Sequence, residues 1–231
     1  TKLKQTILSI LMQDVVDFEI IISDDGSNEN YFDKIIELFT KQGFEHYVLI
    51  NSDVNTGIVK NLQRAVDKSR GEYIKTISPG DMLYSKSVLQ EWMDFVVSNN
   101  IIASFGKGVY YNDDIKFIIL RHRSVPKYID GYRGLGDKDI RKEYLLLDDM
   151  ALGAAYLTQK QYLKKYLKKI EDKVFLGEDF MYTLMVFDGI QLELFDKNVI
   201  FYEFGHGVST SGNIRFTNLM LQDWESMHTL M

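Results

Sequence analysis

The sequence predicts an α/β fold in which short strands alternate with helices around a mixed, mostly parallel sheet. Three apolar runs rich in β-branched residues read as strands, at 18–23 (FEIIIS), 46–50 (HYVLI) and 72–77 (EYIKTI). Each run is followed by a stretch with helical periodicity, at 31–42, 58–69 and 86–98. Strands that alternate with helices in this way are typical of βαβ units. The first hundred residues therefore predict a nucleotide-binding type of architecture.

The composition limits the classes of function. A chain of 231 residues with 45% hydrophobic side chains is long enough to bury a proper core. Its net charge of −6 argues against nucleic-acid binding by general phosphate neutralisation. The chain has no cysteine, which excludes disulfides, thiolate metal sites and a thiol nucleophile. Since no apolar run approaches the ~20 residues that span a bilayer, we expect a cytoplasmic protein.

The first residues have a helical pattern, with Leu3, Ile7, Ile10 and Leu11 on one face. No strand precedes this pattern in the numbering. We therefore expect that the beginning of the domain is missing from these residues.

The second half of the chain has a different pattern. Residues 101–120 predict strands joined by turns at 106–108 and 112–114, and residues 122–140 predict a long irregular loop. The remaining predicted elements are helices at 158–170 and 178–188, a hairpin around 196–198 and a final helix from about 213.

Two carboxylates, Asp24 and Asp25, stand at the carboxyl end of the first predicted strand, where Gly26 begins a turn. Ligands of open parallel sheets bind at this edge, so the pair can accept hydrogen bonds from a base or a ribose. The alternative is that one aspartate caps the next helix while the other is solvated.

A third carboxylate, Asp81, follows the strand at 72–77 after the turn Ser78-Pro79-Gly80. It is expected at the same sheet edge as Asp24 and Asp25. Acids converging there suit a nucleotide and a hard cation, because carboxylate oxygens bind Mg²⁺ or Mn²⁺ well. The alternative is a Pro-Gly turn whose aspartate caps the helix that begins near Ser85.

Two further motifs carry polar groups. Glu178 and Asp179 precede a predicted helix, where they can act on a substrate or merely complement the helix dipole. His206 lies between two glycines, whose backbone can approach a ligand closely. A lone histidine is more often structural.

Four blocks of the chain, in order, resemble the family 2 glycosyltransferases. They are QTILSILMQDVVDFEIIISDDGSNEN, NTGIVKNLQRAVDKSRGEYIKTISPGDML, LGEDFMYTLM and GHGVSTS. The resemblance implies the GT-A fold, and transfer of a sugar from a nucleotide diphosphate, here a UDP-sugar, to an acceptor hydroxyl. It also implies inversion at the sugar and a divalent metal. Members normally have a strand before the first helix, which agrees with the expectation that the start is missing.

The resemblance also implies roles for the donor-side residues. Asp25 resembles the family's contact to the donor base, with Asp24 as its neighbour. Asp81 aligns with a metal-contacting position for Mg²⁺ or Mn²⁺, although Ser78 and Gly80 replace two acids of the family's motif. Donor binding is also assigned to Ser78, Lys60 and His206, and Ser209 and Ser211 fit a Ser-x-Ser near the diphosphate.

On the acceptor side, Asp179 resembles the general base that takes the proton from the attacking hydroxyl, and Glu178 resembles an acceptor-binding residue. The expected division of the chain is a nucleotide-sugar-binding half at 1–100, an acceptor-binding and catalytic half at 101–211, and a helical extension at 212–231.

The acceptor is expected to be a saccharide or a lipid-linked saccharide. The predicted helix in 158–172 is basic and amphipathic, so it either lies on an anionic membrane or packs its apolar stripe on the core. Two rival functions stay open from the sequence. They are a nucleotidyltransferase, and a non-catalytic sugar-nucleotide-binding module motivated by the acids lost at Ser78 and Gly80.

Overall fold

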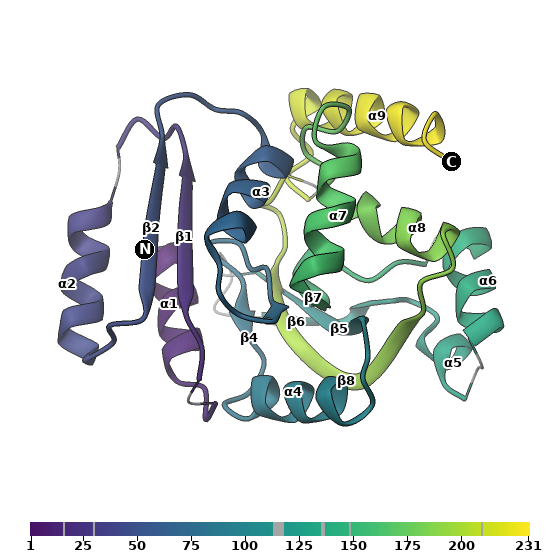
Figure 1. The fold of residues 1–231 in the computed structure, drawn as a ribbon, viewed down its shortest axis with the longest axis horizontal. Coiled ribbons are helices and arrows are strands. Elements are labelled where there is room, and N and C mark those ends of the chain that lie inside the picture. The colour runs from purple at the N-terminus through teal and green to yellow at the C-terminus, as the bar shows by residue number, and fades with distance from the viewer. Residues whose placement is uncertain (16, 30, 113–117, 135–136, 148, 209) are drawn as a thin grey trace.

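The structure is a computed structural model that describes residues 1–231 except 16, 30, 113–117, 135–136, 148 and 209, and these described residues form two sheets flanked by helices (Figure 1). The helices are α1 (Lys2–Leu11), α2 (Phe32–Gln42), α3 (Ile58–Lys68), α4 (Val88–Ser98), α5 (Ile129–Tyr132), α6 (Asp137–Leu147), the short η1 (Gly153–Ala155), α7 (Lys160–Ile170), α8 (Phe180–Phe187) and α9 (Ile214–His228). The strands are β1 (Ile20–Asp25), β2 (Tyr47–Ser52), β3 (Tyr73–Ile74), β4 (Met82–Leu83), β5 (Ala103–Asn112), β6 (Ile118–Val125), β7 (Tyr156–Gln159) and β8 (Leu192–Glu203).

The smaller sheet is the predicted βαβ unit. Strand β1 pairs with β2 in parallel, from Ile20 opposite Tyr47 to Asp25 opposite Ser52, with α2 as the crossover. A separate small core lies between α1, β1 and α2, where the buried residues are Ile7, Ile20, Ile35 and Phe39. This unit forms one end of the molecule (Figure 1).

The larger sheet has the strand order β3-β7-β5-β8-β4, and β6 pairs with β5. Strands β5 and β8 run parallel, whereas the β3–β7, β5–β7, β5–β6 and β4–β8 pairs are antiparallel. The α/β class and the mixed character of the sheet are therefore confirmed, but the prediction of a mostly parallel sheet is wrong, because most of the strand pairs in the described residues are antiparallel. The parallel pairs of the described residues are β1–β2 and β5–β8.

The turn predicted at 106–108 is wrong, because β5 continues through both glycines. At Gly106 a Cβ atom would lie only 2.3 Å from Cγ1 of Val199 on β8. The glycine here permits the close approach of a neighbouring strand and does not end its own. The second predicted turn, 112–114, extends into residues outside the described part of the chain.

The hairpin predicted around 196–198 is also wrong, since β8 runs straight through these residues. Asn198 lies opposite Lys107 in the parallel pair with β5, at a register shift. The Lys107 ammonium forms an ion pair of 2.8 Å with the Asp196 carboxylate. Asp196 and Asn198 thus contact the neighbouring strand β5 where the register of the pair shifts. The local sequence does not reveal such long-range contacts.

The long loop predicted at 122–140 is wrong as well, because this range holds the end of β6, all of α5 and the first turn of α6. Buried Tyr132 donates a hydrogen bond of 2.5 Å to the carbonyl oxygen of Asp149, and Ile140 is buried in the main core. Tertiary packing of these apolar residues stabilises helices that the many glycines and charges do not favour.

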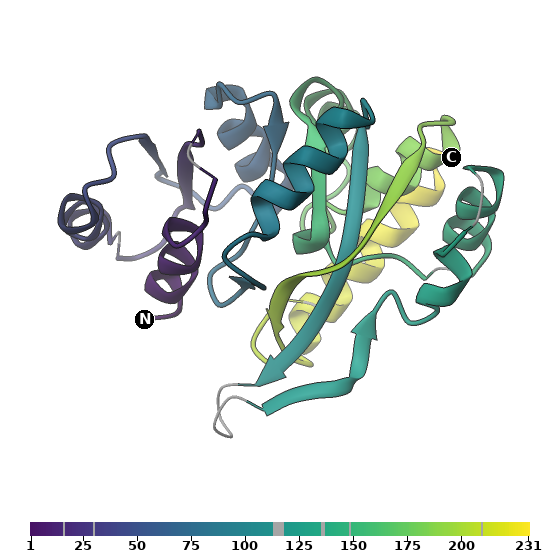
Figure 2. The ribbon, with the colours of Figure 1, turned by 90° about the horizontal axis from the view of Figure 1, so that it is seen from below.

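The main core fills both faces of the larger sheet. On one face Trp92 of α4 stacks on Phe195, and its indole N–H donates to the Ser104 hydroxyl at 2.8 Å. On the other face Phe105 packs edge-on against Tyr132. Figure 2 shows α4 beside the long strand β5, into which the chain leads from the end of this helix.

The basic helix predicted at 158–170 begins later than predicted, because 156–159 form β7 and α7 starts at Lys160. The apolar stripe of α7 is buried on the core, and its members are Leu163, Tyr166, Leu167 and Ile170. Its lysines form ion pairs with carboxylates of the same chain, as in Lys164–Asp67 at 2.6 Å. The stripe is therefore not free to enter a membrane. Among the described residues, no helix has the length and the apolar composition that crossing a bilayer requires.

Candidate active site

Asp25, at the end of β1, accepts four hydrogen bonds from Thr56 and Gly57, just before α3, and from Arg64 of α3. Its Oδ2 accepts from the backbone N–H groups of Thr56 at 2.9 Å and Gly57 at 2.8 Å. Its Oδ1 accepts from the Thr56 hydroxyl at 2.7 Å and from the Arg64 guanidinium at 2.5 Å. A carboxylate has about four lone-pair sites, so the protein itself fills the accepting capacity of Asp25.

These contacts also decide the ionisation of Asp25. Burial by itself raises the pKa of this carboxyl group, but the hydrogen bonds from Thr56, Arg64 and Gly57 outweigh burial and lower the pKa below 3.8. Asp25 is therefore a charged anchor that holds the loop between β2 and α3. The contact to the donor base that the family resemblance implies for Asp25 stays a prediction.

The neighbouring Asp24 is more available. Its Oδ1 accepts a hydrogen bond of 2.8 Å from the backbone N–H of Ser27, in the turn that follows β1. The Lys60 side chain is 46% exposed, and its ammonium group forms an ion pair of 3.0 Å with Asp172. Arg64, one turn further along α3, forms an ion pair of 2.5 Å with Asp25.

Asp81 follows the turn after β3 and is buried, with only 4% of its surface exposed. Its Oδ1 accepts a hydrogen bond of 3.1 Å from the backbone N–H of Glu203 on β8. Its Oδ2 is buried and has no hydrogen-bond partner among the described residues. The backbone of the turn is held by α1, because the Thr6 hydroxyl donates to the Asp81 carbonyl oxygen at 2.8 Å.

An ammonium group that sequence reasoning missed, that of Lys75, lies near Asp81. It donates to the carbonyl oxygens of Ala154 and of Thr76, the latter at 2.7 Å. Burial raises the pKa of Asp81 to about 7, which Lys75 and the Glu203 amide oppose. Burial likewise lowers the pKa of Lys75 to about 7, against the attraction of Asp81. A lysine inside an otherwise apolar strand, EYIKTI, was the signal for it.

Ser78 and His206, two of the predicted donor-binding residues, are both exposed. They lie on two turns, and Asp81 is hydrogen-bonded to Ser78 in the first turn and to Glu203 just before the second. The Ser78 carbonyl oxygen accepts from the Asp81 backbone N–H at 3.1 Å. The turn with His206 follows Glu203, whose backbone N–H donates to Asp81. Ser211 donates its backbone N–H to the Gly207 carbonyl oxygen at 3.0 Å, and Ser209 lies outside the described residues.

Glu178 and Asp179 come just before α8, with Asp179 as its N-cap residue. The side chains are partly buried and lie against η1. A Cβ atom at Gly153 would be 2.9 Å from Oε1 of Glu178 and 3.6 Å from Oδ2 of Asp179. Gly153 therefore leaves room for both carboxylates, and sequence reasoning missed this.

Both groups hold their protons more tightly than usual. Burial, followed by the charge of Asp179, raises the pKa of Glu178 to about 8, and burial raises the pKa of Asp179 to about 6. Two adjacent carboxyl groups of this kind share a proton near neutral pH. The pair can therefore both accept a proton and donate a hydrogen bond near neutral pH.

Short contacts join the three acidic regions. The backbone N–H of Ile58, next to Gly57, donates to the Phe175 carbonyl oxygen at 2.8 Å, which ties the Asp25 loop to the segment before Glu178. On the other side, the Thr76 hydroxyl donates to the carbonyl oxygen of Gly153 at 3.3 Å. The structure thus brings the segments carrying Asp25, Asp81 and the Glu178–Asp179 pair together.

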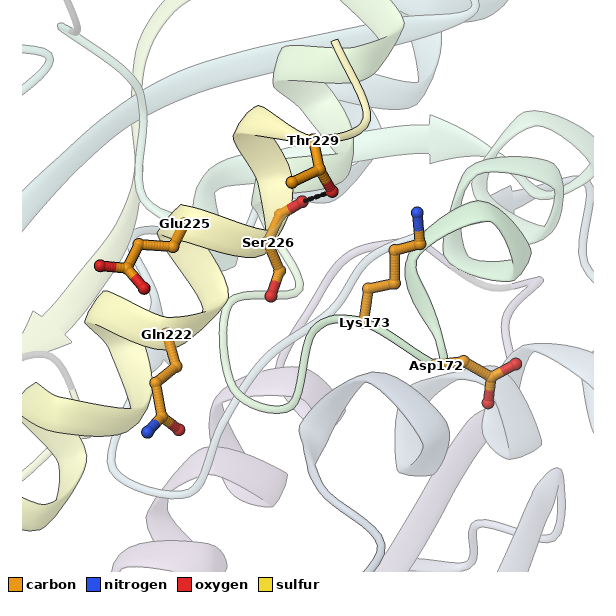
Figure 3. Close-up of a pocket in the computed structure, with 6 residues that line it drawn as sticks. All are labelled: Asp172, Lys173, Gln222, Glu225, Ser226 and Thr229. Carbon is orange, nitrogen blue, oxygen red and sulfur yellow. Dashed lines mark hydrogen bonds between the residues drawn. The ribbon is translucent and has the colours of Figure 1, made fainter.

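Two hollows in the described part of the chain lie apart from these acids, along α9. One of about 550 Å³ lies between α9 and residues 172–173 (Figure 3). Figure 3 shows Glu225 and Asp172 pointing away from each other, so this hollow gathers no acid pair. The other, of about 490 Å³, is lined by Phe175 and the first half of α9. Within the described residues, no group of three or more histidine and acidic side chains could hold a metal ion.

Comparisons with known proteins agree with this arrangement. A family model described as glycosyl transferase family 2 matches residues 1–171. A protein of Methanocaldococcus jannaschii, described as uncharacterized glycosyltransferase MJ1057, is 26% identical over 178 residues, which are 77% of this chain. The match covers 57% of that protein, so the chain spans less than two thirds of the relative's length.

Solved structures show the same fold. Crystal structures of S. aureus TarS 1–349 with UDP and with UDP-GlcNAc superpose with TM-scores of 0.63 and 0.66, at 15% and 16% identity. Each comparison covers 97% of this chain, and 61% and 62% of the TarS chain. The fold is therefore of the GT-A type that the sequence predicted.

Proposed function

The chain belongs to glycosyl transferase family 2, since the family model matches residues 1–171 of 231, and on this premise we propose that it transfers a hexosyl group from a UDP-sugar to an acceptor hydroxyl. The TarS complexes with UDP and UDP-GlcNAc support this donor. The proposed acceptor is a saccharide or lipid-linked saccharide of a polysaccharide. The proposed location is cytoplasmic, at the membrane surface where the acceptor is lipid-linked.

The Glu178–Asp179 pair carries the proposal. In an inverting transfer, the acceptor oxygen attacks the anomeric carbon, loses its proton to a base and displaces the nucleoside diphosphate. Asp179 is proposed as that base, because burial raises the pKa of its carboxyl group and makes the carboxylate a better proton acceptor. Glu178 beside it, whose pKa burial also raises, is proposed to bind the acceptor.

The donor is proposed to lie between the β1 turn and the turn at 78–81. Asp25 shapes the loop through Thr56 and Gly57, and Asp24 supplies a carboxylate that can accept from a base or ribose. Ser78 and His206 are exposed on the neighbouring turns and are proposed to contact the diphosphate. Lys60 joins them only by leaving its ion pair with Asp172.

Mg²⁺ or Mn²⁺ is proposed to bind at Asp81. The buried Oδ2 atom without a partner, beside the Glu203 carboxylate, is the kind of hard oxygen ligand that these cations take. Asp81 would supply one ligand of about six, and phosphate oxygens and water the others. When bound, the cation neutralises charge on the departing diphosphate.

The test is release of UDP from UDP-GlcNAc, with and without Mn²⁺, by the full chain and by Asp179→Asn. We expect Asp179→Asn to lower turnover by at least ~100-fold while the affinity for UDP, measured by calorimetry, stays within about twofold, because a general base contributes ~10²–10⁴ to the rate. Asp94→Asn, on the exposed face of α4, is the matched control and keeps full turnover. Equal turnover in both variants would refute the role of Asp179.

A non-catalytic module that binds sugar nucleotides is the second candidate. The deep burial of Asp81 and the absence of a three-acid cluster among the described residues favour it. Binding of UDP-GlcNAc without turnover in any metal, and with a range of saccharide acceptors, would establish this alternative.

A further inference from the structure

Asp223, in the middle of α9, is buried and holds the segment that leads to Glu178. Only 3% of its surface is exposed. Its Oδ1 accepts from the backbone N–H of Phe175 at 2.8 Å, and its Oδ2 accepts from those of Leu176 at 2.6 Å and Gly177 at 2.9 Å. Three successive N–H groups thus surround one carboxylate, an arrangement that fixes the backbone conformation of all three residues.

The segment 175–177 connects the two sides of the candidate site. Its first residue, Phe175, accepts a hydrogen bond of 2.8 Å from Ile58 through its carbonyl oxygen. The Phe175 ring packs so closely on Gly57 that a Cβ atom there would lie 2.6 Å from it. Gly57 in turn donates to Asp25. The chain then passes directly into Glu178 and Asp179, so a shift of 175–177 moves the acid pair relative to the donor loop.

We propose that Asp223 is a positioning residue, which fixes Glu178 and Asp179 against η1 and the donor loop by binding the three amides before them. The inference rests on the proposed function, because it takes the acid pair as catalytic. The Asp223 charge also helps to raise the pKa of Glu178, as expected for a carboxylate close to this segment. The residue lies outside 1–171, the part that the family model matches.

The experiment compares the full chain with Asp223→Asn, which keeps the shape of the side chain but replaces one accepting oxygen by an amide N–H₂. The control is Glu225→Gln, two residues away on the exposed side of α9. Four quantities are measured: the thermal midpoint, backbone amide exchange, UDP affinity, and kcat and KM for UDP-GlcNAc.

For Asp223→Asn we expect faster exchange at the amides of 175–177, no change in the amides of β5 and β8, and UDP affinity and donor KM within about twofold. We expect kcat to fall on the order of 10–100-fold, because displacing a catalytic group by about 1 Å costs up to ~10²-fold. Glu225→Gln should leave all four quantities unchanged.

If Asp223→Asn does not fold, Gly177→Ala tests the same segment from the other side, since its Cβ atom would lie 2.7 Å from the Phe180 ring. It should reproduce the loss of kcat. An unchanged kcat in a folded variant overturns the inference alone. A fall in kcat together with faster amide exchange throughout the core also overturns the inference, because that combination indicates a general loss of stability. Failure of the unmodified protein to turn over any donor overturns the proposed function instead, and the inference with it.

Discussion

Replacing Asp25 by alanine removes the acceptor of four hydrogen bonds at once, and we expect it to lower the free energy of unfolding by about 3 kcal/mol. The two backbone N–H groups of Thr56 and Gly57 lose their bonds to the carboxylate. Each buried donor left unpaired costs ~1–3 kcal/mol. The Gly57 N–H keeps a second acceptor, Oδ1 of Asn55 at 3.2 Å, and the loop is partly accessible to water. The lower part of that range therefore applies, which gives about 2 kcal/mol for the pair of amides.

The loss of the ion pair with Arg64 adds about 1 kcal/mol. The Arg64 side chain is 31% exposed, so water replaces part of the attraction, and such pairs contribute little. Arg64 also keeps its hydrogen bonds to the Thr56 hydroxyl at 2.8 Å and to the Asn61 side chain at 3.1 Å. For a domain of this size, a total of about 3 kcal/mol lowers the thermal midpoint by ~6–12 °C.

Urea unfolding followed by circular dichroism measures the effect, with Asp24→Ala as the matched control. Asp24 is the adjacent carboxylate and receives one hydrogen bond from Ser27, so we expect its loss to cost under ~1 kcal/mol. A double-mutant cycle with Arg64→Ala isolates the ion pair. Equal destabilisation by Asp25→Ala and Asp24→Ala would refute the anchoring role of Asp25.

The pH dependence provides a second check on the same residue. The folded pKa of Asp25 is lowered from 3.8, so its stabilisation is complete above the unfolded value and is lost as the pH falls through the folded one. The difference between the unmodified protein and Asp25→Ala should therefore be constant from pH 5 upward and shrink below about pH 4. A difference that grows on acidification would contradict the assignment.

Two other predictions concern the buried acids. The pKa of Asp81 is raised from 3.8 to about 7, which means that the charged form of this carboxyl group is disfavoured in the folded protein. Asp81→Asn should therefore raise the free energy of unfolding at pH 8 by up to ~4 kcal/mol, with no gain left at pH 4. A lower urea midpoint of this variant at pH 8 would contradict the prediction. Sugar transfer should speed up as the pH rises through about 6, where Asp179 loses its proton, and a flat rate between pH 5 and pH 7 would exclude this residue as the base.

The sequence predicted the local elements of the first half well. Apolar runs rich in β-branched residues and helical stripes with period 3.6 are set by neighbouring residues, and they located β1, α2, β2, α3 and α4 to within a few residues. The strand-end acids Asp25 and Asp81 were recognised in the same way, because a turn directly follows each apolar run. The pair at 178–179 was found from its place before a helix.

The second half depended on partners far along the chain. Whether 106–108 or 196–198 turns or continues is decided by the pairing of β5 with β8, which brings Gly106 against Val199. The polar residues in both stretches are ordinary turn formers, so local chemistry favoured a turn, and the long-range sheet contacts prevailed.

By itself, the sequence determined which side chains are available and which segments are strands or helices, since periodicity and turn chemistry act over a few residues. Only the tertiary structure decided how those side chains are used. It fills the accepting capacity of Asp25, buries Asp81 beside Lys75, and seats Asp223 on the amides before Glu178. Burial and hydrogen bonding of a carboxylate are set by whatever packs around it, and here the groups that donate hydrogen bonds to these carboxylates come from residues 31 to 122 positions away.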